Sequence, residues 1–345
     1  MVIVNNPGDW STVYPPLLHA DWHGWTPTDL IFPFFLFIVG VSITLSRSAG
    51  RPAAIVRRGA VIWGLGLCLA AFPFFHLSTL RIPGVLARIA WCYVAAALLA
   101  RRLSSSPHRC RTIAATTGGL LIAYWMLLTA VPVPGGSAGD LSPEGNLGAW
   151  IDRALLGGHL WRPGWDPEGI LSTVPAVGTT LLGVLAGWQM QTERSSKRLI
   201  RTWLMWGVAG VTAGLALSPW MPINKSLWTS SYVLFTGGAA SISLAAAYWW
   251  CDDRPGPARL TLTEPLVALG RNAILLFVLS GLLAKTLLYL NWPDPSVALG
   301  RWIYTAAFAP LAPPALASLC YAIANLLVLY ALMAVLHRRR VYLIV

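Results

Sequence analysis

The stretch HADWHGWTPTDLIFPFFLFIVGVSITLS, residues 19–46, contains the pattern that decides the fold. From residue 27 onward it is a nearly continuous apolar run whose only charged residue is Asp29. A helix needs roughly 20 apolar residues to cross the hydrocarbon core of a bilayer, and 27–46 is of that length. We therefore predict a membrane-spanning helix here.

The composition extends this prediction to the whole chain. The 345 residues are 56% hydrophobic and 11% charged, whereas soluble domains have about 25% charged residues. This balance argues against a soluble enzyme, a nucleic-acid-binding protein and a disordered protein. It predicts a single all-α, polytopic membrane domain over 1–345 with about nine full crossings. The expected crossings lie near 27–46, 59–75, 84–100, 112–131, 170–190, 202–218, 230–250, 266–289 and 315–336.

The placement of charge predicts the orientation of these crossings. Of the charged residues, 25 are Lys or Arg and 13 are Asp or Glu, a net charge of +12. Basic residues cluster in short segments between apolar runs, and such segments stay on the cytoplasmic side. The clusters are Arg47–Arg58, Arg101–Arg111, Arg194–Arg201, Arg254–Arg259 and Arg338–Arg340. We expect a multi-pass protein of the inner, cytoplasmic membrane with a cytoplasmic C-terminus.

Three further segments complete the expected topology. Most acidic residues fall on the opposite side, where 132–169 forms an extracytoplasmic loop. The run 297–311 ends in prolines, so we expect a re-entrant or interfacial segment rather than a crossing. Residues 1–6, MVIVNN, read as the remnant of a truncated first helix.

The segment before the first crossing contains the first candidate site. Thr26 is a good N-cap and Asp29 can complete a capping box, which would give Asp29 a structural role. His19 and His23 are either interfacial residues or catalytic ones, since imidazole titrates near neutral pH. Their i, i+4 spacing could hold a metal in a helix, but Gly24 disfavours a helix there. No third ligand is apparent, so we expect no metal.

Four other segments place polar residues beside apolar runs. Arg88 lies one turn inside an expected crossing, where a charge either snorkels to the interface or is paired or in contact with a wet cavity. Elsewhere, Asp166 and Glu168 form a carboxylate pair at the start of an expected helix, and Asn224 and Lys225 lie in a polar stretch before another. The amide of Asn272 follows Gly270 and can bind a ligand or join two helices.

Six short motifs occur in an order that resembles one family. They are MVIVNNPGDW, HADWHGWTPTDLIFPFFLFIVG, LRIPGVLARIAWCY, WDPEGILSTVPA, PINKSLWTSSYVL and GRNAILLFV. The chain looks like a bacterial member of the heparan-α-glucosaminide N-acetyltransferase family, and the resemblance runs over essentially its whole length. The resemblance implies transfer of acetyl from cytoplasmic acetyl-CoA to the amino group of a terminal glucosamine across the membrane.

The resemblance also implies roles for individual residues. His19 matches the active-site histidine of the family, whereas His23 occupies an asparagine position. Asn5 matches an active-site asparagine, and Asp29 matches an aspartate of the family. The sequence departs from the family pattern at Ala87, Arg271 and Ser280, where glutamine, methionine and histidine are usual, and in the absent first helix.

These implications fit the chemistry expected of the residues. An imidazole can deprotonate an ammonium near pH 7 or accept the acetyl group itself. An amide such as Asn5 or Asn272 can donate a hydrogen bond to the developing oxyanion. We expect His19 and Asn5 to be catalytic. Asp29, Asp166, Glu168 and Asn272 are expected to bind the acceptor, and Arg88, Asn224 and Lys225 the acetyl-CoA co-substrate.

The expected partners follow from this interpretation. They are acetyl-CoA, an amino sugar or glucosamine-terminated saccharide, and membrane lipids. We expect no nucleic-acid partner, and a homodimer is compatible with the sequence. Two other classes share much of the pattern. A secondary transporter for a sugar or amine would need no acetyl-CoA, and a membrane O-acyltransferase would acetylate a polysaccharide hydroxyl.

Overall fold

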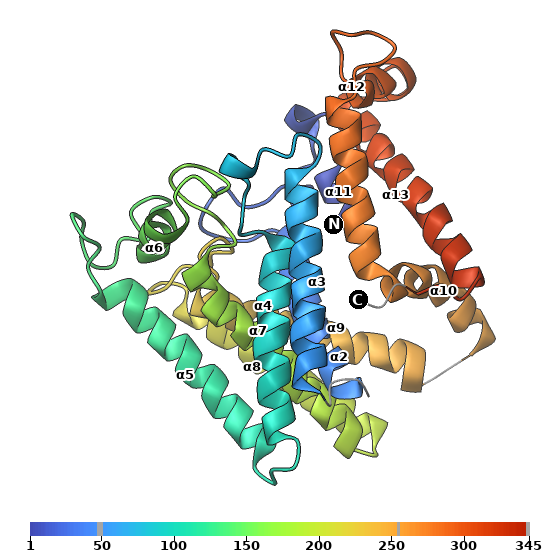
Figure 1. Ribbon diagram of the computed structural model, residues 1–345. Helices are drawn as coiled ribbons and strands as arrows, with labels where there is room; N and C mark the ends of the chain where they lie inside the picture. Colours follow the sequence, from blue (N-terminus) through green and yellow to red (C-terminus); the bar gives the residue numbers. More distant parts are fainter. Residues whose placement is uncertain (47–50, 254–255, 343–345) are drawn as a thin grey trace.

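A computed structural model of the chain describes residues 1–46, 51–253 and 256–342, apart from the side chains of 257, 258 and 260. Throughout these ranges the regular structure is helical (Figure 1). The α-helices are α1 (Val2–Asn5), α2 (Ile31–Leu45), α3 (Pro52–Ala71), α4 (Val85–Leu103), α5 (Arg109–Ala130), α6 (Leu147–Leu156), α7 (Ile170–Thr192), α8 (Ser196–Leu217), α9 (Ser230–Tyr248), α10 (Pro257–Arg271), α11 (Ala273–Tyr289), α12 (Leu299–Ile303) and α13 (Pro314–Arg338). The 3-10 helices are η1 (Trp10–Thr12), η2 (Pro15–Leu17), η3 (Pro27–Leu30) and η5 (Leu77–Thr79), and the π-helices are η6 (Trp249–Asp253) and η7 (Tyr304–Phe308).

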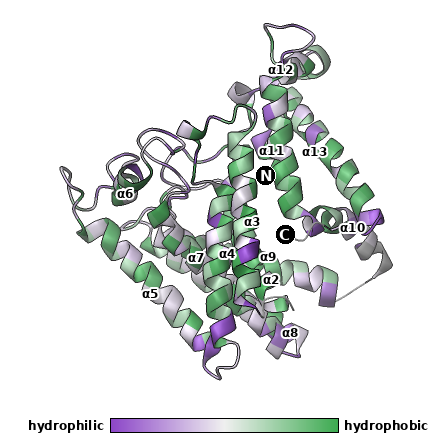
Figure 2. Cartoon of the chain, viewed as in Figure 1, coloured by the Kyte–Doolittle hydropathy of each residue, from purple (hydrophilic) through white to green (hydrophobic). Residues whose placement is uncertain are grey.

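The predicted all-α membrane fold is confirmed. Within the described ranges, seven helices are long and apolar enough to cross a membrane, and a bent pair raises this number to eight. α4, with 19 residues, is also long enough to cross a membrane, but it carries three arginines, including Arg88. Every run expected to cross is helical over most of its length, although α3 ends at Ala71 and not at residue 75, and in Figure 2 these helices are mainly hydrophobic along their lengths.

One expected crossing is not a single straight helix. The run 266–289 is divided at Asn272 into α10 and α11, which meet at an angle of 72°. The hydropathy of the run is continuous, so it predicts one span, whereas the backbone of Asn272 leaves the helical region with φ −119° and ψ 36°. The sequence 297–311 forms only the short α12 and η7 and no crossing-length helix.

The backbone of α2 comes into direct contact with the backbone of α7. A Cβ atom added to Gly40 would lie 2.0 Å from the carbonyl oxygen of Thr180, and one added to Gly183 would lie 1.9 Å from that of Phe37. Small residues permit this approach between membrane helices. The crossing fixes α2, and with it the segment that precedes it.

The C-terminal helices form a separate group beside this core. Figure 1 shows α11 and α13 next to one another, with α12 at one end of the pair and α10 at the other. α1 packs against α13 and also touches α11. The group meets the rest of the protein through α3, since the Lys285 ammonium donates to the carbonyl oxygens of Leu69 and Phe72 at the end of that helix.

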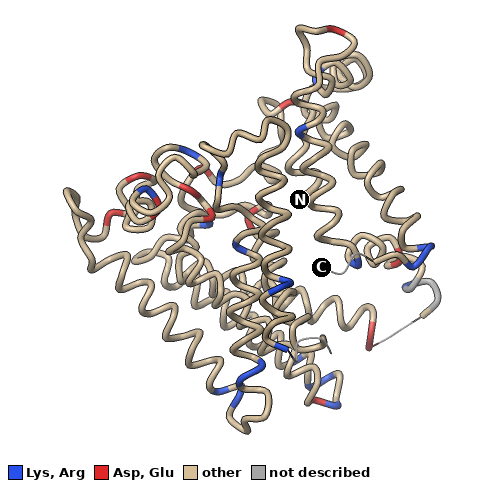
Figure 3. Tube along the Cα trace, viewed as in Figure 1, with Lys and Arg blue, Asp and Glu red and all other residues tan. Residues whose placement is uncertain are grey.

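The two ends of the helical core differ in charge. Figure 3 shows Lys and Arg gathered at the α4–α5 and α7–α8 turns, whereas many acidic residues lie toward the opposite end, around α6. Two members of the expected basic clusters, Arg47 and Arg254, lie outside the described residues. The segment before η3 lies at the acidic end, because Trp22 donates its indole hydrogen bond to the Leu141 carbonyl oxygen in the 132–169 segment at 2.9 Å.

Candidate functional site

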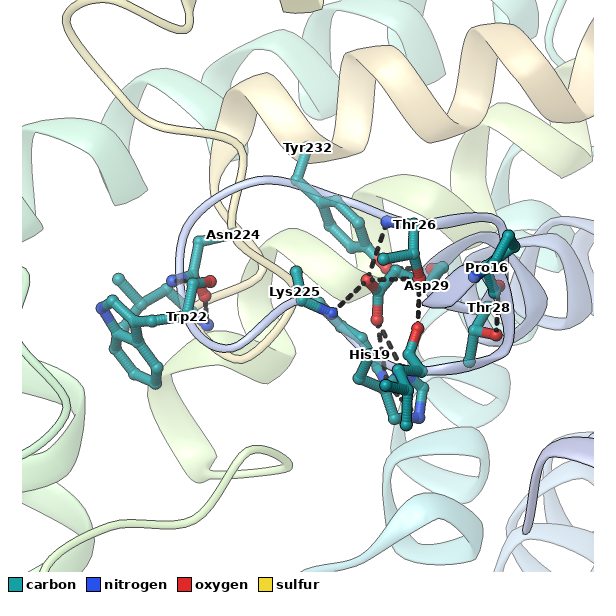
Figure 4. Close-up of polar contacts among 12 residues, drawn as sticks. Pro16, His19, Trp22, Thr26, Thr28, Asp29, Asn224, Lys225 and Tyr232 are labelled. Atoms are coloured by element: carbon teal, nitrogen blue, oxygen red, sulfur yellow. Dashed lines mark hydrogen bonds and ion pairs between the residues drawn. The ribbon is translucent and has the colours of Figure 1, made fainter. Parts of the chain in front are cut away.

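His19 and Asp29 form the centre of the polar cluster at the start of α2 (Figure 4). His19 Nδ1 lies 2.6 Å from Asp29 Oδ1. Asp29 is 1% exposed, whereas the His19 side chain is 47% exposed. The Asp29 side chain is therefore enclosed by protein, while the imidazole remains accessible to a substrate.

The second oxygen of Asp29 holds the chain that leads into α2. Asp29 Oδ2 accepts hydrogen bonds from the backbone N–H of Ala20 at 3.1 Å and of Thr26 at 3.0 Å, and from the Thr26 hydroxyl at 3.2 Å. The predicted capping box between Thr26 and Asp29 is present. One carboxylate thus closes the first helical turn and contacts His19.

This contact decides which imidazole nitrogen can react. A carboxylate accepts hydrogen bonds, so it favours the neutral tautomer that has its proton on Nδ1. The lone pair of the neutral ring is then on Nε2. A histidine held in this way can accept a proton or act as a nucleophile through Nε2.

Lys225 joins the cluster from the loop between α8 and α9. Its Nζ lies 3.0 Å from His19 Nδ1, 3.2 Å from His19 Nε2 and 3.5 Å from Asp29 Oδ1. Burial lowers the pKa of the Lys225 ammonium, and the attraction of Asp29 only partly offsets this. The cluster therefore has a cation within hydrogen-bond distance of both imidazole nitrogens of His19.

Asn224 is buried, and its hydrogen bonds connect the Lys225 loop to the loop that contains His19 and His23. Its amide nitrogen donates to the Trp22 carbonyl oxygen at 2.8 Å and lies 3.2 Å from His23 Nδ1. Its amide oxygen accepts from the backbone N–H of Leu227 at 2.8 Å. These three contacts connect both loops through Asn224. Burial lowers the pKa of His23.

The sequence interpretation missed the role of Tyr232 on α9. Its hydroxyl is fully buried and donates to the backbone carbonyl oxygen of Asp29 at 2.5 Å. The residue lies in the stretch PINKSLWTSSY, which the sequence singled out as a polar helix start. The available signal was the tyrosine in an otherwise small and polar first turn.

The two acidic residues of the 160s form a cluster of their own with Arg81. The Arg81 guanidinium donates to both oxygens of Asp166, at 2.8 and 2.6 Å, and to Glu168 at 2.5 Å. These carboxylates raise the pKa of Arg81. Asp166 and Glu168 are buried, and both carboxylates are paired with Arg81. Sequence spacing gave no sign of Arg81, which lies more than 80 residues away.

Arg88 points inward and does not snorkel to the interface. It is fully buried, donates to the Gly169 carbonyl oxygen at 3.3 Å and to the Ser172 hydroxyl, and lies over the Trp228 ring with 5.0 Å to its centroid. Its Nε and Nη1 have no hydrogen-bond partner among the described residues. Trp228 follows Lys225 in the same loop and donates its backbone N–H to the Lys225 carbonyl oxygen. Arg88 therefore adjoins the His19 cluster through this loop.

The two remaining candidates, Asn5 and Asn272, lie elsewhere. Asn5 is exposed on α1, and no hydrogen bond to His19 is found for it within the described ranges. Its neighbour Asn6 is the buried residue, and its amide donates to the Ser280 hydroxyl at 3.1 Å. Asn272 is buried at the α10–α11 bend and donates to the Val341 carbonyl oxygen at 3.2 Å. Across residues 1–46, 51–253 and 256–342, no three His, Cys, Asp or Glu side chains form a group that could hold a metal.

Comparison with known proteins identifies the relatives of the chain. It matches no protein-family model. It is 31% identical to the heparan-alpha-glucosaminide N-acetyltransferase of Mus musculus over 343 residues, and 29% identical to that of Homo sapiens over 342. Each match covers 81% of the chain and 50% of the relative, so the chain spans about half the length of the curated relatives it matches. On this similarity, the chain belongs to the family of the heparan-alpha-glucosaminide N-acetyltransferases.

Proposed function

We propose that the protein transfers an acetyl group from acetyl-CoA to the amino group of glucosamine or of a glucosamine-terminated saccharide. The observation that supports this most is the contact of 2.6 Å between exposed His19 and buried Asp29, in a chain whose relatives are named as glucosaminide N-acetyltransferases. The donor reaches the site from the cytoplasm and the acceptor from the other side of the membrane.

In the direct route, His19 acts as a general base. Nε2 removes a proton from the acceptor ammonium, and the free amine attacks the thioester carbonyl carbon. The amine nitrogen of the tetrahedral intermediate then loses a further proton to solvent, the carbon–sulfur bond breaks, and the imidazolium returns its proton to the CoA thiolate. Asp29 stabilises the imidazolium formed between these steps.

In the covalent route, His19 Nε2 attacks the thioester carbonyl carbon, the carbon–sulfur bond breaks, and the CoA thiolate takes up a proton from solvent. The acceptor ammonium loses one proton to solvent before its nitrogen attacks the acetyl carbon and a second one afterwards, and Nε2 leaves with its electron pair. In both routes an oxyanion develops on the acetyl oxygen close to Nε2. The Lys225 ammonium, 3.2 Å from Nε2, is placed to stabilise it.

Labelled acetyl-CoA tests the proposal. Purified protein is incubated with acetyl-CoA labelled in the acetyl group, with and without glucosamine, and the N-acetylated sugar is quantified. We expect wild-type protein to form labelled product, His19→Ala to form none, and His23→Ala to retain substantial activity. His23 is the matched control, because it lies in the same loop and contacts Asn224 instead of Asp29.

The outcomes separate the alternatives. Label bound to His19 in the absence of sugar would establish the covalent route. Normal turnover by His19→Ala would overturn the assigned role of His19. Counterflow of glucosamine across vesicles without any need for acetyl-CoA would show a transporter, and product formed only on polysaccharide hydroxyl groups would show an O-acyltransferase.

A further inference from the structure

A cavity lined by both apolar and polar side chains lies at the other end of α2 from His19. Its volume is about 200 Å³, several times the roughly 30 Å³ of liquid volume that one water occupies. One wall is the apolar face of α2 around Ile38, with Ser42 and Ser46 near its end. The opposite wall is the α10–α11 bend at Arg271 and Asn272.

Arg58 gives this cavity a positive side. It projects from α3, and its guanidinium lies over the ring of Tyr93, 5.0 Å from the centroid, where both residues line the cavity. Stacking uses the face of the guanidinium and leaves its N–H groups in the plane available to other partners. Its buried Nε has no hydrogen-bond partner among the described residues.

Arg271 adds a second cation at the mouth, and the C-terminal segment holds it there. Its Nη1 donates to the Tyr342 hydroxyl at 2.7 Å, and the guanidinium stacks on the Tyr342 ring at 5.0 Å. The Tyr342 hydroxyl also lies 3.3 Å from Nδ1 of His337, whose Nε2 lies 2.7 Å from Glu264. Glu264 is thus engaged by His337, and no carboxylate lines the cavity among the residues that the structure describes.

We propose that this cavity binds the phosphate groups of the acyl donor, with Arg58 and Arg271 as the anion-binding residues. Two guanidinium groups and the Ser42 hydroxyl fit a pyrophosphate ester, since guanidinium groups bind phosphate oxygens in a bidentate manner. This inference rests on the proposed function, because it takes the donor to be acetyl-CoA.

The length of α2 supports the assignment. Asp29 and Ser42 are 13 residues apart, about 20 Å at 1.5 Å per helical residue. An extended pantetheine arm joins pyrophosphate and thioester over a comparable distance. A donor held by its phosphates in the cavity can therefore present its thioester near His19.

A phosphate ester could also come from a lipid headgroup, so the test separates the two sources. Protein in phosphatidylcholine nanodiscs is titrated with acetyl-CoA and with acetyl-pantetheine, which lacks the pyrophosphate, and the Kd values are measured by calorimetry. The acetyl-CoA titration is repeated in nanodiscs containing phosphatidylglycerol. The variants are Arg58→Gln, Arg58→Lys and Arg271→Gln, with Arg57→Gln as control, because Arg57 is exposed and lies outside the cavity lining.

We expect Arg58→Gln and Arg271→Gln to weaken acetyl-CoA binding about tenfold or more, with acetyl-pantetheine unaffected. Arg58→Lys should retain part of the affinity, and Arg57→Gln should bind as wild type does. Wild-type affinity in both glutamine variants, in a protein that still transfers acetyl to glucosamine, would overturn this inference alone. Competition by phosphatidylglycerol that disappears in Arg58→Gln would assign the site to a lipid headgroup and overturn it as well. Wild-type protein that neither binds acetyl-CoA nor transfers acetyl would overturn the proposed function, and this inference with it.

Discussion

The two oxygens of the Asp29 carboxylate have different roles in the structure. Through one oxygen it closes the turn before α2, and through the other it contacts His19. Asparagine can perform the first task, since its side chain also caps helices. It cannot match the second, because an amide does not stabilise an imidazolium and can present a donor to Nδ1.

Asp29→Asn should therefore separate the two tasks. We expect kcat to fall at least about a hundredfold, since the equivalent change beside a catalytic histidine can cost about 10⁴. The free energy of unfolding should fall by about 1 kcal/mol or less. Steady-state kinetics and thermal unfolding measure the two effects, with exposed Asp21→Asn as the control. Unchanged kcat in Asp29→Asn would show that the carboxylate only caps the helix.

Asp152 makes the stability of the protein depend on pH. It is buried on α6, and its Oδ1 accepts from the backbone N–H of Ile170 at the start of α7, at 2.8 Å. Burial, assisted by the negative charge of Asp166, raises the pKa of Asp152 to about 6. Between pH 4 and 6 the folded protein therefore binds more protons than the unfolded chain, so stability falls as the pH rises through this range.

Asp152→Asn should remove this part of the pH dependence. Asparagine keeps an oxygen that can accept from Ile170 but has no charge to bury. We expect the Tm of wild type to fall relative to that of Asp152→Asn between pH 4.5 and 7. Thermal unfolding in detergent at several pH values gives the difference between the two proteins. A difference that stays constant with pH would contradict the raised pKa.

Local sequence rules predicted a contact within the segment before α2 but not the contacts between distant parts of the chain. The Thr26–Asp29 capping box follows a local rule, and it is present. The pairing of Arg81 with Asp166 joins residues 85 positions apart, which no local pattern specifies. The roles expected for Asp166 and Asn5 remain predictions. Asp166 is paired with Arg81, and Asn5 is exposed on α1.

At the scale of elements, the crossing of α2 and α7 depends on the absence of side chains. Gly183→Ala would place a Cβ atom 1.9 Å from the backbone oxygen of Phe37, which no side-chain movement can relieve. We expect a loss of several degrees in Tm and reduced expression. Gly64→Ala on α3 is the control, because its Cβ would meet nothing within 4 Å, and alanine favours a helix by about 1 kcal/mol over glycine. Equal Tm values in the two variants would show that the helices can separate without cost.

Elements were predictable where hydropathy alone defines them. The run 170–190 corresponds closely to α7, since a long apolar stretch has one stable form in a bilayer. The bend at Asn272 was not predictable from hydropathy, because apolar residues continue on both sides. The local sequence Gly270-Arg-Asn272 was the only signal, and the partner of the hydrogen bond that Asn272 donates at the bend, the Val341 carbonyl oxygen, comes from another part of the chain.

At the scale of the whole molecule, the charge asymmetry predicts how the protein lies in the membrane. The Lys- and Arg-rich turns between α4 and α5 and between α7 and α8 should face the cytoplasm. The His19 loop contacts the 132–169 segment and should face the opposite side. The donor and the acceptor would then approach from different compartments.

Cysteine labelling tests this orientation. In a cysteine-free background that keeps activity, Ser105→Cys and Ser142→Cys each introduce one exposed thiol at opposite ends of the protein. A membrane-impermeant maleimide added to intact cells should label Ser142→Cys and leave Ser105→Cys unlabelled until the membrane is opened. The reverse pattern would invert the topology and place the His19 loop in the cytoplasm.

The contact of Gly40 with α7 limits how the sequence between it and Asp29 can change over time. One inserted residue would turn everything after it by about 100° about the helix axis. Gly40 would then face away from α7, and a side chain would meet the Thr180 carbonyl oxygen at the point of closest approach. We therefore expect residues 29–40 to tolerate substitutions but not insertions or deletions. Insertions and deletions should instead accumulate in exposed connections such as 134–140.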